Sequence, residues 1–257
     1  MKLTFVGTGS GETSLKRNHS SLLLETDESK TLIDCGDGIS SALLKQNINY
    51  NSIDSIIFTH YHADHFSGIT ALVTQMKLRE RKNELRIFTH KNLIAPLKIY
   101  LHSCYIFEDA LDFDLQIIGY DFENEFKVDE KFSFKAKQNS HIQNKHEVKS
   151  IPEQQFVSSS LSFNIGEDKL IYTSDIAARE DLFLFDNRRP KIFITETTHI
   201  DLDWIHGINS YYSPGKIYLT HISDSDEKKV EKYLRNQIFS HKTEVVMAED
   251  GHSVILS

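Results

Sequence analysis

The stretch Thr59-His60-Tyr61-His62-Ala63-Asp64-His65 places three histidines and one aspartate within six residues, directly after the short apolar run Ser55–Phe58. The apolar run predicts a strand, and a strand that ends in a tight loop can turn several side chains toward one point. Imidazole nitrogen and carboxylate oxygen form a donor set that suits zinc, manganese or iron, and such sites usually take further ligands from elsewhere. The stretch therefore predicts a metal centre at the end of this strand, rather than a polar loop that happens to be rich in histidine.

The segments around this stretch follow strand and helix patterns in two similar series. In the first series, strands are predicted at Lys2–Val6, Ser20–Glu25, Thr31–Asp34, Ser55–Phe58 and Leu85–Thr89, and helices at 38–46, Phe66–Arg81 and Leu93–His102. The second series has strands within Leu111–Lys137 and at Ser159–Ile165, Leu170–Thr173, Lys191–Thr195, Lys216–Thr220, Thr243–Val246 and Ser253–Leu256, with helices between 195 and 216 and at Ser225–Asn236. Because the same order of strands and helices occurs twice, we predict an α/β fold with two sheets face to face and helices outside.

Composition limits the class of protein. The chain has 257 residues, of which 39% are hydrophobic and 26% charged, so a packed core is expected and wholesale disorder is excluded. No apolar run approaches the length of a transmembrane helix, and the apolar start is too short for a signal peptide. Cys35 and Cys104 cannot form a disulfide framework, which predicts reduced thiols and a cytoplasmic location. A formal net charge of −8 argues against a protein that mainly coats nucleic acid. Since no linker is visible, we predict one domain over residues 1–257.

Five motifs, in the same order along the chain, resemble those of the metallo-β-lactamase superfamily. They are Phe5–Gly11, Leu32–Gly38, Thr59–His65, Tyr172–Asp175 and Leu219–Ser223. The resemblance covers most of the chain. It implies the superfamily's fold, a four-layer αββα sandwich of two mixed β-sheets with helices on the outer faces.

The resemblance also implies two divalent metal ions, with zinc expected and manganese or iron as alternatives. The implied ligands are His60, His62 and His141 for the first ion, Asp64, His65 and His221 for the second, and Asp175 as the bridge. His141 is the expected third histidine because it follows the predicted strand Phe132–Lys137, and His146 in the same loop is its alternative. Asp64 is expected both to ligate a metal and to orient the nucleophile.

Two further segments resemble the branch that contains ribonuclease Z and related phosphodiesterases. The first is Thr13–Ser21, which supplies Lys16 and Arg17 as candidate phosphate-binding cations, with solvated loop charges as the alternative. The second is Glu196-Thr197-Thr198-His199, where a glutamate ends a strand and a nearby histidine faces the site. It makes His199 the candidate general acid. His206 is the alternative, because the segment from His199 to the last ligand is shorter than in ribonuclease Z.

The substrate is predicted to be small. Ribonuclease Z carries an extended arm that grips RNA, whereas residues 83–135 contain one glycine and one proline and predict no such arm. The acidic chain also offers little counterion release on binding RNA. We therefore predict a phosphodiesterase whose metal-bridging hydroxide cleaves a cyclic nucleotide, another small phosphodiester or an RNA 3′ end, with RNA the less favoured substrate.

Two other interpretations keep the same metal ligands. The dinuclear site could hydrolyse a carbonyl compound such as a lactone, a thioester or a β-lactam, or the protein could bind metal or nucleotide without catalysis. As partners we expect a small phosphodiester or nucleotide and no membrane. A homodimer is consistent with the resemblance.

Overall fold

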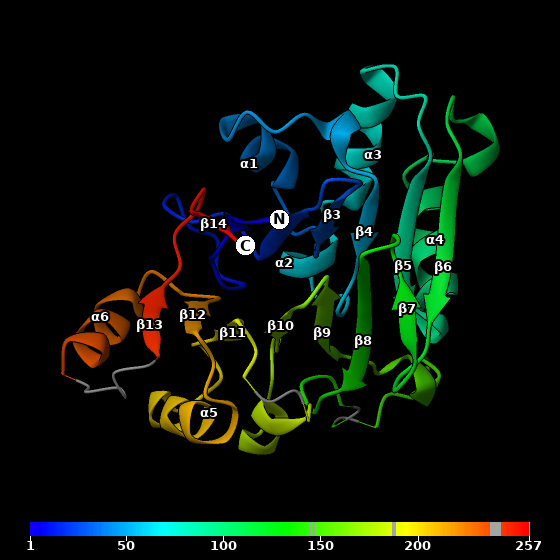
Figure 1. The fold of residues 1–257 in the computed structure, drawn as a ribbon. Coiled ribbons are helices and arrows are strands. Elements are labelled where there is room, and N and C mark those ends of the chain that lie inside the picture. The colour runs from blue at the N-terminus through cyan, green and yellow to red at the C-terminus, as the bar shows by residue number, and fades with distance from the viewer. Residues whose placement is uncertain (144, 146, 187–188, 237–242, 257) are drawn as a thin grey trace.

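A computed structural model describes residues 1–143, 145, 147–186, 189–236 and 243–256. They form two seven-stranded sheets that lie face to face, with helices on both outer faces (Figure 1). The first sheet has the order β14 (Ser253–Ile255), β1 (Lys2–Gly7), β2 (Ser21–Glu25), β3 (Lys30–Ile33), β4 (Ser55–Ile57), β5 (Leu85–His90) and β6 (Leu115–Tyr120). The second has the order β13 (Glu244–Met247), β12 (Lys216–Thr220), β11 (Ile192–Glu196), β10 (Asp168–Tyr172), β9 (Ser159–Ile165), β8 (Phe132–Gln138) and β7 (Glu125–Lys127).

The helices are α1 (Ile39–Lys45), α2 (Ala63–Phe66), α3 (Ile69–Leu78), α4 (Ile94–Ser103), α5 (Ile205–Tyr212) and α6 (Glu227–Asn236). Both sheets are mixed: β3 to β6 and β10 to β13 run parallel, and the remaining pairs are antiparallel. The predicted fold class is therefore confirmed.

Three apolar layers hold the sandwich together. The middle layer lies between the sheets and joins residues such as Leu22 and Ile57 to Phe163 and Ile194. One outer layer packs α1, α3 and α4 on the first sheet, and the other packs α5 and α6 on the second. Since most central strands are covered on both faces, they are buried at almost every position instead of alternating between buried and exposed residues.

The predicted helix Phe66–Arg81 is wrong in its bounds. The structure has α2 ending at Phe66 and α3 beginning at Ile69, with Gly68 between them. A Cβ atom at Gly68 would lie 2.2 Å from the carbonyl oxygen of Gly36. Gly68, between the two helices, therefore lets the segment after β4 pack against the loop after β3. A residue with a side chain at this position would prevent that contact.

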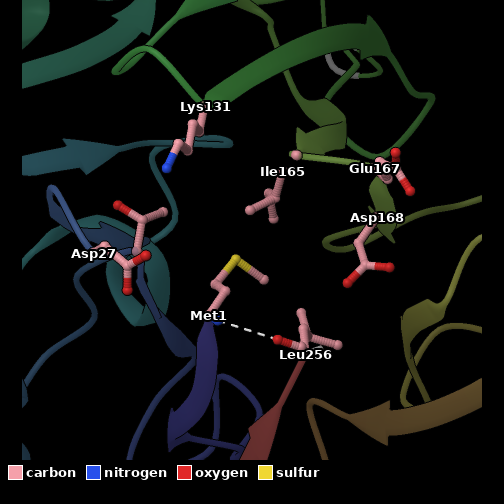
Figure 2. A pocket seen from close by; sticks show the side chains of 9 residues that line it. Met1, Asp27, Lys131, Ile165, Glu167, Asp168 and Leu256 are labelled. Atoms are coloured by element: carbon pink, nitrogen blue, oxygen red, sulfur yellow. Dashed lines mark hydrogen bonds between the residues drawn. The ribbon is translucent and has the colours of Figure 1, made fainter.

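The two edges of the sandwich differ in what they carry. The carboxyl ends of β3, β4, β10, β11 and β12 meet at one edge, and the loops there contain all the motifs that end in histidine or aspartate. At the opposite edge, a pocket of about 330 Å³ lies among turns between strands, and Figure 2 shows Met1, Asp27 and Lys131 on its wall. Among the described residues, no helix is both long and apolar enough to cross a bilayer.

Candidate metal centre

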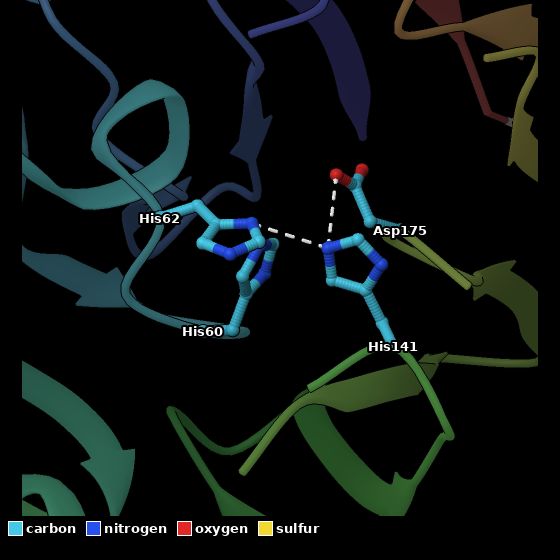
Figure 3. A group of neighbouring side chains, drawn as sticks. All are labelled: His60, His62, His141 and Asp175. Carbon is cyan, nitrogen blue, oxygen red and sulfur yellow. Dashed lines mark hydrogen bonds and ion pairs between the residues drawn. The ribbon is translucent and has the colours of Figure 1, made fainter. Parts of the chain in front are cut away.

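Seven side chains from four separate segments converge at the first of these edges. One ligand atom from each of His60, His62, His141 and Asp175 lies within 4.8 Å of the others, and the same holds for Asp64, His65, Asp175 and His221. In Figure 3, His60 and His62 lie on the loop after β4 and face His141 and Asp175 from across the centre. The structure thus brings together all seven predicted ligands in the two predicted groups. Buried clusters of this composition are typical of a dinuclear metal site.

Asp175 lies between the two groups. Its Oδ2 atom is 3.6 Å from Nε2 of His141 and 3.2 Å from Nε2 of His221, and its Oδ1 atom is 3.3 Å from Nε2 of His65. The Asp175 carboxylate therefore faces both groups. Its Oδ2 atom lies near a histidine of each group, and its Oδ1 atom lies near a second histidine of the second group. This is the geometry that a bridging ligand requires.

Three histidines are oriented by hydrogen bonds on the ring atom that faces away from the cluster. Nδ1 of His65 donates to Oδ2 of Asp34 at 2.8 Å, and Nδ1 of His221 donates to Oγ1 of Thr198 at 3.2 Å. Nδ1 of His60 lies 3.1 Å from Oγ1 of Thr59. These bonds fix each ring so that Nε2 points into the centre, as in metal sites whose outer partners set the tautomer of the ligand.

The backbone at this edge is held in an uncommon conformation. Asp34, Ser174 and His221 have positive φ angles of 60°, 54° and 55°, and each comes just after a strand. Residues with side chains rarely adopt this left-handed region, and such strain collects where a fold must aim particular groups. Here it turns the chain sharply enough for strands of two different sheets to direct their following residues to one point.

The centre as it stands contains polar atoms that the protein itself does not satisfy. Nε2 of His60, Nε2 of His65 and Oδ1 of Asp175 are buried and form no hydrogen bond among the described residues, and the last two face each other as an ion pair at 3.3 Å. Burial lowers the pKa of His60 well below its usual range and lowers that of His141 to about 4, so both rings are neutral and able to donate a lone pair. Burial opposes ionisation of Asp175, but the imidazoles of His221 and His65 hold its pKa well below the usual range. The donor set fits two divalent cations.

His199 lies at the rim of the centre. Its ring centroid is 4.9 Å from that of His141 and 5.5 Å from that of His221. Nδ1 donates to both carboxylate oxygens of Glu196 at 3.0 Å, and this hydrogen bond raises the pKa of His199. A half-exposed imidazole with a buried carboxylate behind it is suited to deliver a proton.

The remaining predicted residues lie elsewhere. Arg17 is buried and donates to Oγ1 of Thr8 and to the carbonyl oxygen of Ala248, and it forms an ion pair with Glu227. Lys16 is exposed and pairs with the same glutamate. These contacts tie both cations to α6, and their role in substrate binding stays a prediction.

Two histidines are alternatives, His206 for the general acid and His146 for the third ligand of the first ion. His206 lies on α5, with its ring centroid 6.3 Å from that of Tyr233. His146 lies outside the described residues.

Sequence reasoning missed several residues that hold the site loops. Asp250 accepts hydrogen bonds from the backbone of Thr8 and Asn18 and so fixes the opening loop. Asn139 and Asp181 hold the segment that carries His141. All three belong to residue types that commonly cap turns, but nothing in their spacing indicates partners so far away along the chain.

Comparison with known proteins is consistent with this geometry. Residues 1–245 match the family model described as anti-Pycsar protein Apyc1. The chain belongs to this family. The anti-Pycsar protein Apyc1 of Bacillus phage vB_BveM-Goe7 is 28% identical to it, over 99% of this chain and 98% of the phage protein. A ribonuclease Z of Archaeoglobus fulgidus is also 28% identical, but over 58% of this chain and only 46% of the ribonuclease.

A solved structure shares the fold of this Apyc1-family chain. The metallo-β-lactamase fold protein YhfI from Bacillus subtilis superposes with a TM-score of 0.78 over 98% of both chains, at 18% identity. The predicted metallo-β-lactamase fold is thereby confirmed. Together with the His/Asp centre, membership of the Apyc1 family makes the chain a hydrolase of the phosphodiesterase class, as predicted.

Proposed function

We propose that this chain hydrolyses cyclic nucleotides to linear nucleoside monophosphates, using two divalent ions held by the seven side chains of the centre. The observation that carries the proposal is the pair of ligand groups that share Asp175, in which the buried Nε2 atom of His60 has no hydrogen-bond partner among the described residues. Membership of the Apyc1 family supports a cyclic nucleotide as the substrate.

The architecture supports a small substrate. Residues 83–135 are all described, and they form β5, α4, β6, β7 and the start of β8, which pack into the sheets and their helical cover. They leave no segment of this range to serve as an extended RNA-gripping arm. The chain also covers less than half of the ribonuclease Z that it resembles, so that similarity supports the shared site and not the RNA substrate.

Zinc is the ion that the donor set favours. Five imidazoles and two carboxylates supply nitrogen and oxygen donors of the kind that zinc prefers, and manganese and iron accept the same donors. When bound, such ions polarise the phosphoryl group and lower the pKa of water.

The protein's own residues then have separate roles. Asp64, whose pKa His221 lowers to about 2 against the effect of burial, stays ionised and can orient the attacking water. The water oxygen joins phosphorus as one ring P–O bond breaks. His199, which Glu196 holds by Nδ1, delivers a proton from its other ring nitrogen to the leaving oxygen. The attacking water gives up both protons as its oxygen becomes a phosphate oxygen. Solvent carries one of them to reprotonate His199 and takes up the other, so atoms and charge balance.

The experiment is a substrate panel with parallel metal analysis. Purified protein is incubated with 3′,5′-cyclic nucleotides, bis-p-nitrophenyl phosphate, a precursor transfer RNA and a lactone, with metal content measured on the same sample. We expect linear monophosphates from cyclic nucleotides and about two ions per chain. Lactone turnover would favour the carbonyl interpretation. Bound metal without any turnover would mean a binding protein.

We also propose a cytoplasmic location and a homodimer. Both cysteines are free thiols, Cys35 buried and Cys104 exposed, which supports a reducing compartment. Size-exclusion chromatography with light scattering tests the dimer, and a fluorescent fusion tests the location.

A further inference from the structure

One buried carboxylate joins the loops that carry two of the ligands. Asp181 accepts hydrogen bonds from Ser140 through both oxygens, from the backbone nitrogen at 3.2 Å and from Oγ at 2.6 Å. The same carboxylate accepts from the backbone nitrogens of Ala177 and Ala178, at 3.2 Å and 3.1 Å. Ser140 directly precedes His141, and Ala177 comes two residues after Asp175. Asp181 therefore couples the third histidine of the first group to the shared aspartate.

Asn139 adds a second connection in the same place. Its Oδ1 atom accepts from the backbone nitrogen of His141 at 3.2 Å, and its Nδ2 atom donates to the carbonyl oxygen of Thr173 at 3.3 Å. The segment from Asn139 to His141 has no helix or strand to hold it. Bonds from Asn139 and Ile142 to Ser158 hold the segment on one side. The side chains of Asn139 and Asp181 connect it to the end of β10 and to the loop that follows.

A local role for Asp181 explains only part of its contacts. Asp181 lies in the short 3₁₀ helix Arg179–Phe183, and its bonds to Ala177 and Ala178 satisfy backbone donors at the start of that helix. The two bonds to Ser140 span 41 residues and contribute nothing to that helix. Asp181 is only 7% exposed, and through these two bonds it holds the loop that carries His141.

We propose that Asp181 is a positioning residue that sets the metal affinity of the first group, by fixing His141 relative to Asp175. The inference rests on the proposed metal centre. The second group depends on this connection only through the shared Asp175, because its other members, Asp64, His65 and His221, follow β4 and β12 and are all buried. Loss of the connection is therefore expected to weaken one ion and spare the other.

Two substitutions separate the connection from the local cap. Asp181→Asn keeps one acceptor oxygen. With that oxygen in the place of Oδ2, which accepts from Ala177, Ala178 and the Ser140 hydroxyl, an amide group faces the backbone nitrogen of Ser140, where an acceptor is needed. Ser140→Ala removes the 2.6 Å bond and leaves the cap untouched. The matched controls are Asp129→Asn and Ser29→Ala, which make the same changes in the two partners of the 2.5 Å Ser29–Asp129 hydrogen bond, between two turns at the opposite edge. Metal-free protein is titrated with zinc against a chromophoric chelator.

We expect wild type and both controls to bind two ions. Asp181→Asn and Ser140→Ala should bind one ion with unchanged affinity and the other about 10- to 100-fold more weakly, the range seen when the outer partners of metal ligands are removed. Excess zinc should restore kcat in both variants with KM unchanged, which a general loss of folding would not allow.

Two results would overturn the inference, and they are distinguishable. If wild type binds two ions and both variants bind them as wild type does, Asp181 acts only as a cap and the proposed function is untouched. If wild type binds no ion, the metal centre itself is refuted and the inference falls with it.

Discussion

The two ligand groups differ in how the fold holds them. Asp64, His65, Asp175 and His221 are buried on every side and follow strands or lie on α2. In the other group, His62 is exposed and His141 is half-buried on an irregular segment, and only His60 and Asp175 are fully buried. The comparison indicates that the group with Asp64, His65 and His221 is rigid, because the sheets hold its ligands. The group with His60, His62 and His141 is adaptable, because a loop supplies His141 and substrate can approach the exposed His62. Each of the following substitutions tests that division.

Asp175→Ala should have the largest effect, because this residue belongs to both groups. Both ions should be lost, and kcat/KM for a cyclic nucleotide should fall by about 10³- to 10⁴-fold, since Lewis-acid stabilisation is worth several kcal/mol and each 1.36 kcal/mol is tenfold in rate. Metal analysis and initial rates on the same sample measure both quantities. Retention of one ion would show that the groups do not share this ligand.

His65→Ala and His62→Ala should differ in stability more than in activity. His65 is fully buried and hydrogen-bonds Asp34, so its removal leaves a buried carboxylate without its imidazole partner and with hydrogen bonds from Thr59 in its place. The free energy of unfolding of the metal-free protein should fall by about 3–5 kcal/mol for His65→Ala, and by no more than about 0.5 kcal/mol for the exposed His62→Ala. Urea denaturation in the presence of chelator measures the difference. Equal losses would contradict the division into a rigid and an adaptable group.

His199→Gln should reduce turnover without removing either ion. General acid catalysis contributes about 10²- to 10⁴-fold, so kcat for a cyclic nucleotide should fall within that range. Bis-p-nitrophenyl phosphate should be affected much less, because p-nitrophenolate leaves without a proton. Equal losses on both substrates would instead place His199 in binding or in metal retention. His206→Gln on α5 is the control and should leave both rates unchanged.

How far the sequence predicts this centre follows from where each ligand lies. His60, His62, Asp64 and His65 are contiguous, so their chemistry is visible without the fold. Asp175 and His221 each end a strand-like motif that resembles the superfamily's. His141 has no motif of its own and was predicted from its order alone, after one strand and before another. The four-layer fold was predictable because apolar runs, covered on both faces, differ clearly from the polar loops between them.

What the sequence did not indicate is how the loops are held. Asp181 reaches Ser140 across 41 residues, and Asp250 reaches Thr8 across 242 residues. Single polar residues in loops give no periodic signal, and their partners are decided only when the sheets come together. The same limit applies to Arg17, because its ion pair with Glu227 spans 210 residues.

Arg17 and Lys16 provide the smallest expected effects on catalysis. The contacts of Arg17 predict that Arg17→Ala lowers the free energy of unfolding by about 2–3 kcal/mol, since buried oxygens lose a charged donor, and changes KM by less than a factor of about 3. Arg81→Ala is the matched control: Arg81 is also buried, but it donates to the carbonyl oxygens of Asn51, Asn83 and Glu84, away from the centre.

Lys16→Ala helps to separate a structural role of the opening loop from a role in phosphate binding. Lys16 is exposed, so its loss should leave the free energy of unfolding nearly unchanged. If the opening loop only supports the centre, both Arg17→Ala and Arg81→Ala lose stability and all three variants keep their KM for a cyclic nucleotide. If the loop contacts the phosphate instead, KM rises for Arg17→Ala and Lys16→Ala but not for Arg81→Ala. Substrate would then contact the opening loop as well as the loop that carries His141. The adaptable ligand group would therefore lie on the face of the centre where substrate binds.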